Sequence, residues 1–488
     1  MKLLDSIAEK LDNKYLTLAF ILLAAFFIRI YKLGFEGLWT DEMISVYASN
    51  PNVSLRRMYD VLHFWDQTPP LYPVLFMIWL KITGFTEFNA RLFSVIGGLL
   101  SLLVVYQLIK ELYNRRTALL ITLLVSLTPY HIYFSREARS YIWSFLATAL
   151  VLLFFYRQLR NYSTKYNRLF FILCGGLFMH VSYFSFFIHS GLVAIVLLTF
   201  FTKKEKVDLK NWIIDYILIG LMFLPWLMQF IRILGFHNGD NGSQPSVLYI
   251  FDMLSVFSAS RAGGFILAIS YAAVLLGFFY VILIQKRNFK NEYIWLTAIL
   301  LFLIIFALMF MKSMGGRNIL NHFMYSYVIV LFPVFLILLG GIFYASNRLA
   351  LAALLAVFLI ANTYHYKEWL HLSYHKKKSE PYRQMADFIA GSADAKAPIL
   401  CAIAYLQEFY FYTKKMDAQL VSLHDIDKKI NPATVEKFWI VDSYDLVSDS
   451  LLTEAKKRYP VQVLQTNIIK PSTGNITFRA ILAKIEKK

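Results

Sequence analysis

Two short polar motifs carry the residue types that acid–base and phosphate chemistry need. The first is an acidic pair, Asp41 and Glu42, which follows the first apolar run of the chain. In the second motif, Arg136 and Arg139 bracket Glu137 between two later apolar runs. A carboxylate at a membrane mouth can act as a general base, or bind a cation or a hydroxyl-rich substrate. A guanidinium group can donate hydrogen bonds to two phosphate oxygens at once, so the second motif suits a phosphate or pyrophosphate.

Each motif also has an ordinary explanation that the sequence leaves open. An acidic pair in a solvated loop needs no function. Asp60 and Asp66 are alternative acids in the same segment. The two arginines can extend along the membrane surface, or one of them can pair with Glu137 inside the protein.

Further polar residues are expected near these motifs. Arg91 opens the second apolar run, and the same face of the membrane is predicted to carry His63, Lys81, Lys312, Arg317 and His322. His180 and Tyr183 interrupt a long apolar run, where a histidine more often makes an interhelical hydrogen bond than catalyses. The sequence has no H-E-x-x-H or C-x-x-C spacing and no G-x-S-x-G elbow, so no metal site is predicted and a serine hydrolase is not favoured.

These motifs lie between runs long enough to cross a bilayer. Hydrophobic residues make up 58% of the 488 residues and charged residues 16%, which excludes a soluble enzyme, a disordered chain and a disulfide-rich secreted domain. A bilayer core of about 30 Å takes about 20 apolar residues per helix. On that basis about eleven spans are predicted, at roughly 15–33, 91–112, 117–133, 139–157, 168–180, 182–202, 212–232, 263–284, 293–311, 322–344 and 349–364.

The net charge of +18 does not indicate nucleic acid, because much of it lies in short loops between the spans. Lys and Arg in such loops mark the cytoplasmic side, which places the N-terminus inside. The outer face then receives residues 34–90, the loop 233–262 and, for an odd number of spans, the tail after about residue 365. An even number would move the tail to the cytoplasm.

Two outer segments are predicted to have structure of their own. Ser54–Trp65 and Leu71–Thr83 are too short to span and are expected to lie in the membrane interface. The tail alternates helix-like and strand-like patterns and predicts a small extracytoplasmic α/β domain at 366–488, beside a transmembrane domain at 1–365. Its helices are expected at Tyr382–Ala390 and Leu451–Arg458, and its strands at Ile399–Ala404, Phe438–Val441, Val461–Thr466 and Phe478–Ile485.

The order of the motifs resembles one enzyme family. It is similar to that of the integral-membrane GT-C glycosyltransferases of the protein O-mannosyltransferase and lipid A aminoarabinose transferase type (glycosyltransferase family 39). The matching residues are Trp39–Glu42, Pro69–Leu71, Arg91-Leu92, Thr128-Pro129 and Ser135–Tyr141. The resemblance is specific across about residues 15–200, looser to 365 and absent from the tail.

The resemblance implies a polytopic α-helical GT-C fold in a bacterial plasma membrane. It also implies a sugar donor on a polyprenyl phosphate, a lipid, glycan or protein acceptor at the outer face, and an inverting transfer. Asp41, Glu42 and Glu137 are assigned to catalysis. Asp41 matches the first-loop acid, the expected base, and Glu42 lies beside it. Glu137 matches the second-loop acid, and the donor phosphate is expected at Arg136 and Arg139.

Further roles follow from the same resemblance. Arg91 matches the arginine that opens the second span, and it is expected to bind the donor phosphate. Many relatives have an Arg-Tyr pair at the start of a late span, where this sequence has His322-Phe323. Arg317 or His322, or else Lys312, is therefore expected to supply that cation. Substrate contacts are assigned to His63, Lys81, His180 and Tyr183.

Two other classes remain as alternatives. A flippase or transporter for a lipid-linked sugar also needs outer-face cations and a lipid groove, and an oligosaccharide ligase has a similar topology. A transporter would more naturally show inverted repeats and broken helices at the bilayer midplane. Here the acids gather at one predicted face, which favours chemistry. No cofactor is assigned, although a divalent cation held by two carboxylates is left open.

Overall fold

The computed structural model describes residues 15–64, 66, 68–160, 164–202, 208–235, 327–346, 356, 381–401, 408, 410, 418–443, 450–470 and 478–486. The described chain divides into two compact units. The helical unit comprises residues 1–31, 59–75 and 92–366, and the α/β unit comprises residues 32–58, 76–91 and 367–488. The predicted spans at 263–284 and 293–311 lie outside the described residues, as does all but one residue of the span at 349–364. The number of spans therefore stays a prediction.

Most predicted spans correspond to helices of the structure. Within the described ranges, three helices are long and apolar enough to cross a membrane: Glu87–Leu112 in α6, Tyr141–Arg160 (α9) and Leu209–Arg232 in α12. The other helices of this part of the chain are α2 (Leu16–Ile30), α4 (Leu55–Phe64), α5 (Leu71–Thr83), α7 (Arg115–Leu127), α8 (Pro129–Phe134), α10 (Lys165–Met179), α11 (Ser185–Thr202), η2 (Tyr327–Leu331) and α16 (Phe332–Ala345). The range Glu87–Leu112 is the whole of α6, whereas α12 continues to Gly235 and spans Leu209–Gly235.

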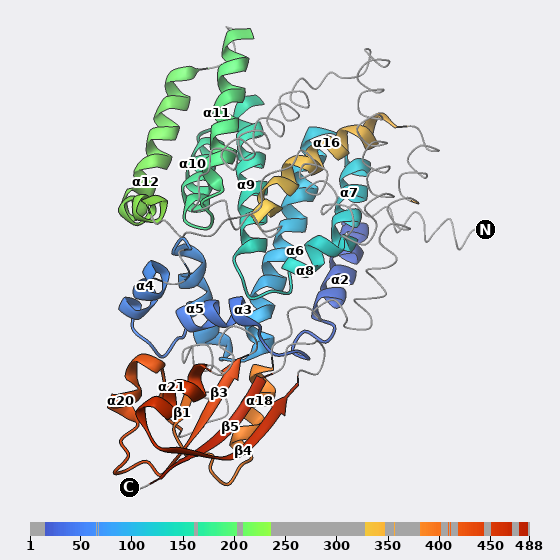
Figure 1. Cartoon of the computed structure of the whole chain (residues 1–488). Helices are drawn as coiled ribbons and strands as arrows, with labels where there is room; N and C mark the ends of the chain where they lie inside the picture. Colours follow the sequence, from blue (N-terminus) through green and yellow to red (C-terminus); the bar gives the residue numbers. More distant parts are fainter. Residues whose placement is uncertain are drawn as a thin grey trace, which may run out of the picture. The chain divides into compact units, whose positions relative to one another are not determined.

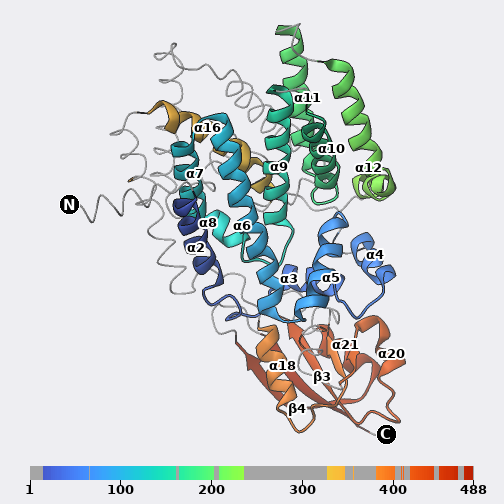
Figure 2. The same cartoon turned by 180° about the vertical axis from the view of Figure 1, so that it is seen from behind.

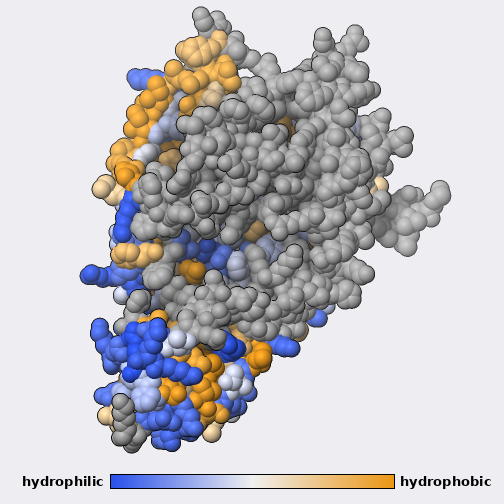
Figure 3. Space-filling model, viewed as in Figure 1, coloured by the Kyte–Doolittle hydropathy of each residue, from blue (hydrophilic) through white to orange (hydrophobic). Residues whose placement is uncertain are grey.

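The helical unit is a bundle in which α10 packs between α9 and α12, while α2 and α16 pack on α7 (Figure 1). Figure 2 shows the same neighbours from behind. Apolar side chains of α11 and α12 remain exposed and form much of the orange surface at the upper left of Figure 3, among them Phe201, Ile217, Leu221, Leu224 and Met228. A helix that is apolar on its outer face suits contact with lipid tails.

Two breaks in the bundle position the polar motifs. The predicted span at 117–133 is divided, because α7 ends at Leu127 and α8 starts at Pro129. Thr128 is extended (φ −65°, ψ 120°), as expected for a residue before proline. The predicted break in the next long apolar run is confirmed, since α10 ends at Met179 and α11 begins at Ser185.

The α/β unit contains a five-stranded sheet of order β2-β1-β3-β5-β4. The strands are β1 (Ile399–Cys401), β2 (Leu420–Val421), β3 (Lys437–Ser443), β4 (Val461–Ile469) and β5 (Phe478–Ile485). Strand β1 pairs in parallel with β2 and β3, whereas β5 is antiparallel to β3 and β4. The helices are α3 (Thr40–Ala48), α18 (Tyr382–Ala390), α20 (Ile426–Lys429) and α21 (Ser450–Arg458), with the 3-10 turn η4 (Leu423–Asp425).

The predicted strands of the tail are therefore present, and among the described strands only the two-residue β2 was not predicted. Leu400, Ile440 and Ile481 of the sheet form one buried core with Leu451 of α21 and Ile426 of α20. Burial of these side chains stabilises the packing of the sheet and its helices. Cys401 of β1 is buried as a free thiol.

Candidate active site

The first acidic motif lies in the α/β unit, where Arg91 holds Glu42. Arg91 Nε and Nη2 donate to the two carboxylate oxygens of Glu42 at 2.9 and 2.6 Å. Its Nη1 donates to the carbonyls of Leu33 and Glu36 at 3.0 and 2.8 Å, and Nη2 also donates to Gly37 O at 2.9 Å. A guanidinium has five N–H groups, and each of them is used. Arg91 thereby ties the irregular segment before α3 to the first turn of that helix.

The two acids of this motif differ in their surroundings. Glu42 is 1% exposed and also accepts a hydrogen bond from Trp39 N at 3.3 Å. Asp41 is only half-buried, and it lies in the first turn of α3, where the helix dipole stabilises negative charge. Glu42 is therefore a buried anchor, and Asp41 is the more accessible carboxylate of the two. The expected contact of Arg91 with a donor phosphate stays a prediction, and it would require Arg91 to exchange one of its bonds.

Residues of the tail also hold this segment within the α/β unit. Tyr410 Oη accepts a hydrogen bond from Leu38 N at 2.6 Å, and Tyr382 Oη lies 3.1 Å from Thr40 Oγ1, next to Asp41. Burial and the neighbouring Glu87 carboxylate raise the pKa of Tyr410 well above its ordinary value. The phenol thus stays neutral.

A second arginine, Arg383 of α18, reinforces the same segment. Its Nε donates to Glu87 Oε1 at 2.8 Å, and its Nη2 is paired with the other oxygen of that carboxylate. Nη1 and Nη2 donate to the carbonyls of Phe35 and Gly34 at 2.8 and 3.0 Å. Arg91 and Arg383 together bind a run of main-chain carbonyls that has no regular secondary structure.

The second motif forms a tight turn between α8 and α9 in the helical unit. Arg136, Glu137 and Arg139 are 5%, 1% and 6% exposed. Arg139 Nη1 lies 3.0 Å from Asp66 Oδ1, and both side chains are largely buried, while Arg136 Nη2 donates to Tyr31 O at 2.8 Å. The ordinary explanation of surface arginines therefore does not hold, because these guanidinium groups are inside the protein.

A third buried arginine, which was not among the predicted site residues, lies in α2. Arg29 is 0% exposed, and its Nη1 donates to the carbonyls of Ala25 and Ser126 at 3.0 and 3.1 Å. Its Nη2 lies 2.8 Å from His131 Nδ1. Within the described part of the chain these acceptors are neutral, and no carboxylate contacts Arg29. A buried guanidinium without a carboxylate adds positive potential to the region of Arg136.

The contacts of His131 fix its protonation. A guanidinium only donates, so Nδ1 accepts from Arg29 and the neutral ring carries its proton on Nε2. Nε2 lies 2.9 Å from Ser101 Oγ, which donates to Gly98 O at 2.7 Å. A Cβ at Gly98 would collide with Ser135, so α6 approaches the end of α8 closely. This network supports the turn that carries Arg136 and Arg139.

Two of the predicted substrate contacts belong to an aromatic cluster of the helical unit. His63 bonds to Gln229 Oε1 and stacks on Tyr59 at 5.4 Å between centroids. Tyr59 packs edge-on against Trp226 at 6.1 Å, and Trp226 Nε1 donates to Tyr183 Oη at 2.8 Å. The cluster joins α4, α12 and the turn after α10.

The remaining predicted residues are less informative. His180 Nε2 lies 2.9 Å from Met222 O, an interhelical bond of the kind expected for a histidine in a membrane bundle. Lys81 is exposed on α5 in the α/β unit. Arg317, His322 and Lys312 lie outside the described residues. Among the residues that are described, no group of three or more His, Cys, Asp or Glu side chains could hold a metal ion.

Comparison with known proteins connects this arrangement to a family. Residues 67–228 match the family model described as dolichyl-phosphate-mannose-protein mannosyltransferase. The crystal structure of ArnT from Cupriavidus metallidurans bound to undecaprenyl phosphate has a TM-score of 0.63 at 13% identity, over 96% of this chain and 98% of that one. The chain has a GT-C fold, as its motifs indicated.

Two further GT-C structures agree. ArnT in the apo state has a TM-score of 0.61 at 11% identity, over 96% of this chain and 97% of that chain. The oligosaccharyltransferase of Archaeoglobus fulgidus in the apo form has a TM-score of 0.52 at 13% identity, over 92% and 73% of the two chains. No curated protein sequence matches the chain. The family match contains Arg91, the Arg136–Arg139 turn, His180 and Tyr183, but it begins after Asp41 and Glu42.

Proposed function

We propose that this protein transfers a sugar from a polyprenyl-phosphate donor to a lipid, glycan or protein acceptor at the outer face of a bacterial plasma membrane. The observation that carries the proposal is the family match over residues 67–228, whose description names a dolichyl-phosphate sugar. It is supported by the GT-C fold, for which an ArnT structure holds undecaprenyl phosphate.

In the proposed reaction an acceptor oxygen attacks C1 of the donor sugar. The bond from C1 to the phosphate oxygen breaks, and polyprenyl phosphate leaves with the electron pair. Asp41 takes the proton of the acceptor, and inversion at C1 follows from the single displacement. Phosphate is a good leaving group, so the transfer needs cations at the phosphate more than it needs a strong general acid.

The proposed phosphate ligands are Arg136 and Arg139. Their burial, together with that of Arg29, supports this assignment, because cations in a water-poor environment act more strongly on a developing negative charge. Asp66 offsets part of the charge of Arg139, to which it is bonded. Glu137 is proposed to stabilise the turn from within, and Glu42 and Arg91 to position Asp41.

The contacts of the tail support its proposed place outside the cytoplasm. Tyr382, Arg383 and Tyr410 bond to the segment 34–40 within the α/β unit. Two segments bonded in this way lie on the same side of a membrane. The contacts therefore support our proposal that the tail lies on the same side as the loop that follows α2, as an odd number of spans requires. The positive loops assign that side to the exterior.

An assay of donor consumption tests the function. Purified protein in nanodiscs is incubated with a panel of short polyprenyl-phosphate sugars, and free polyprenyl phosphate is measured. Release from one donor, increased by a suitable acceptor, is the expected result. Saturable donor binding without release from any donor would instead support the alternative, a flippase or transporter of a lipid-linked sugar.

The tail contacts give a further prediction for this reaction. Tyr410→Phe removes the hydroxyl that binds Leu38 N, which loosens the segment before Asp41. We expect kcat to fall about tenfold with little change in the KM for the donor, because a small displacement of a catalytic group costs rate more than binding.

Tyr459→Phe is the matched control for this variant. Tyr459 is a buried tyrosine of the same unit, and its hydroxyl donates to Ile430 O at 3.1 Å, away from the segment that carries Asp41. Its loss should lower the thermal stability without the fall in kcat. Equal kcat values for the two variants would contradict a positioning role of the tail.

A further inference from the structure

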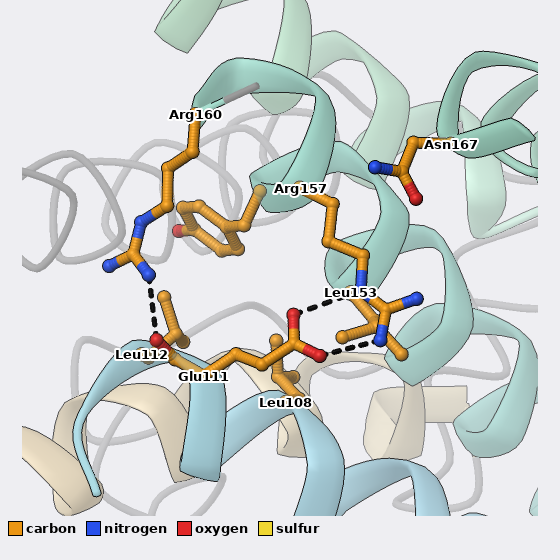
Figure 4. A pocket seen from close by; sticks show the side chains of 8 residues that line it. Leu108, Glu111, Leu112, Leu153, Arg157, Arg160 and Asn167 are labelled. Carbon is orange, nitrogen blue, oxygen red and sulfur yellow. Dashed lines mark hydrogen bonds and ion pairs between the residues drawn. The ribbon is translucent and has the colours of Figure 1, made fainter. Parts of the chain in front are cut away.

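A pocket of about 340 Å³ lies in the helical unit at the C-terminal ends of α6 and α9 and the N-terminal end of α10 (Figure 4). Leucines of α6 and α9 and Tyr156 form its apolar wall, and its polar lining consists of Glu111, Arg157, Arg160 and Asn167. None of the residues assigned to sugar transfer lines this pocket. Its basic loops were predicted to face the cytoplasm, whereas the transfer is proposed for the outer face.

The charges around the pocket do not cancel. Arg157 binds the Glu111 carboxylate through Nε at 2.9 Å and Nη2 at 2.5 Å. Arg160 Nη1 instead donates to the main-chain carbonyl of Glu111 at 2.6 Å, and both arginines reach from α9 toward α6 in Figure 4. Two guanidinium groups and one carboxylate give the lining a formal charge of +1. Arg160 is exposed, so a ligand can reach it.

An exposed apolar face leads away from the pocket along α10. Tyr166, Leu169, Phe170, Leu173 and Leu177 are 75%, 50%, 46%, 39% and 46% exposed. Their spacing of three and four residues places them on one side of the helix. The first of them is adjacent in sequence to Asn167, which lines the pocket. A cationic pocket thus continues into a surface suited to hydrocarbon chains.

We propose that this pocket binds the phosphate group of an anionic membrane phospholipid, with the acyl chains along the exposed face of α10. Guanidinium groups bind phosphate oxygens bidentately, and the Asn167 amide supplies a further donor. The volume lies in the range of small-molecule pockets. Basic pockets between transmembrane helices on the cytoplasmic side recognise anionic headgroups, and anionic lipids are enriched in that leaflet.

Lipid binding to the purified full-length protein tests this proposal. Dioctanoyl phosphatidylglycerol is titrated in detergent, and bound lipid is counted by native mass spectrometry. Arg160→Ala should weaken binding about tenfold, the usual effect of losing a charged hydrogen-bond donor. Arg116→Ala removes the same charge from an exposed arginine at the start of α7, outside the pocket. That variant should stay within about twofold of the wild type.

Further variants and ligands distinguish binding of a phospholipid in this pocket from binding by general surface charge or of a free phosphate. Arg160→Lys keeps the positive charge but lacks the planar guanidinium group, so its loss of lipid affinity should be smaller than that of Arg160→Ala. It also replaces Arg160→Ala in the experiment if that variant does not fold. Equal weakening by Arg116→Ala and Arg160→Ala would overturn the proposal in favour of general surface charge, as would unchanged binding by both Arg160 variants. Glycerol 3-phosphate or inorganic phosphate binding as tightly as the lipid would overturn the lipid assignment.

Discussion

Replacing Asp41 with Asn is expected to lower the rate of sugar transfer by about 10²–10⁴-fold, the usual contribution of a general base. The amide has nearly the same shape as the carboxylate but cannot accept the acceptor's proton at neutral pH. Donor binding should change little, because the proposed phosphate ligands are other residues. The measurement is the release of polyprenyl phosphate under single-turnover conditions, with donor binding followed separately.

Asp60→Asn is the matched control for this result. Asp60 lies in the same predicted outer segment as Asp41 and is exposed on α4. The same chemical change there should leave transfer within about twofold of the wild type, as is usual for an exposed surface position. Full activity of Asp41→Asn would remove this residue from the mechanism. A loss in Asp60→Asn alone would move the base to that position.

Helices, strands and turns were predicted correctly where a short stretch of sequence carries a clear pattern. The polar break at His180 predicted the turn between α10 and α11, and the strand patterns of the tail predicted β1, β3, β4 and β5. The division of the third span was also readable, since Thr128-Pro129 lies inside it and proline cannot continue a helix. A single span at 117–133 was predicted nevertheless, because the length and hydropathy of the whole run fit one membrane crossing.

The site followed from the sequence only in part, because its partners are distant along the chain. Arg29 and His131 are far apart in sequence, and no spacing rule pairs them. The resemblance to the GT-C family suggested a phosphate ligand for Arg91. The structure adds that its N–H groups are all used within the chain, on Glu42 and three carbonyls. Residue type predicts which chemistry is available, whereas the packing decides which groups are already engaged.

The second large effect is expected from breaking the pair of Glu42 and Arg91. Their side chains are 1% and 7% exposed. Removing one member of a buried pair leaves the other charge without its partner, which costs about 3–5 kcal/mol. Glu42→Gln and Arg91→Gln should each lower the unfolding temperature strongly. Glu454→Gln is the control, since Glu454 pairs at the surface with Lys457 and Arg458, whose side chains are 68% and 31% exposed, and exposed pairs contribute little to stability.

A double variant separates a structural role of the Glu42–Arg91 pair from a direct role in transfer. Glu42→Gln combined with Arg91→Gln removes both charges, so it should recover part of the stability lost by either single change. If Glu42 and Arg91 act only by stabilising the fold around Asp41, transfer should recover together with the unfolding temperature. Recovered stability with transfer still abolished would show that Glu42 or Arg91 does more than stabilise the fold, because the fold would be intact while the reaction was not.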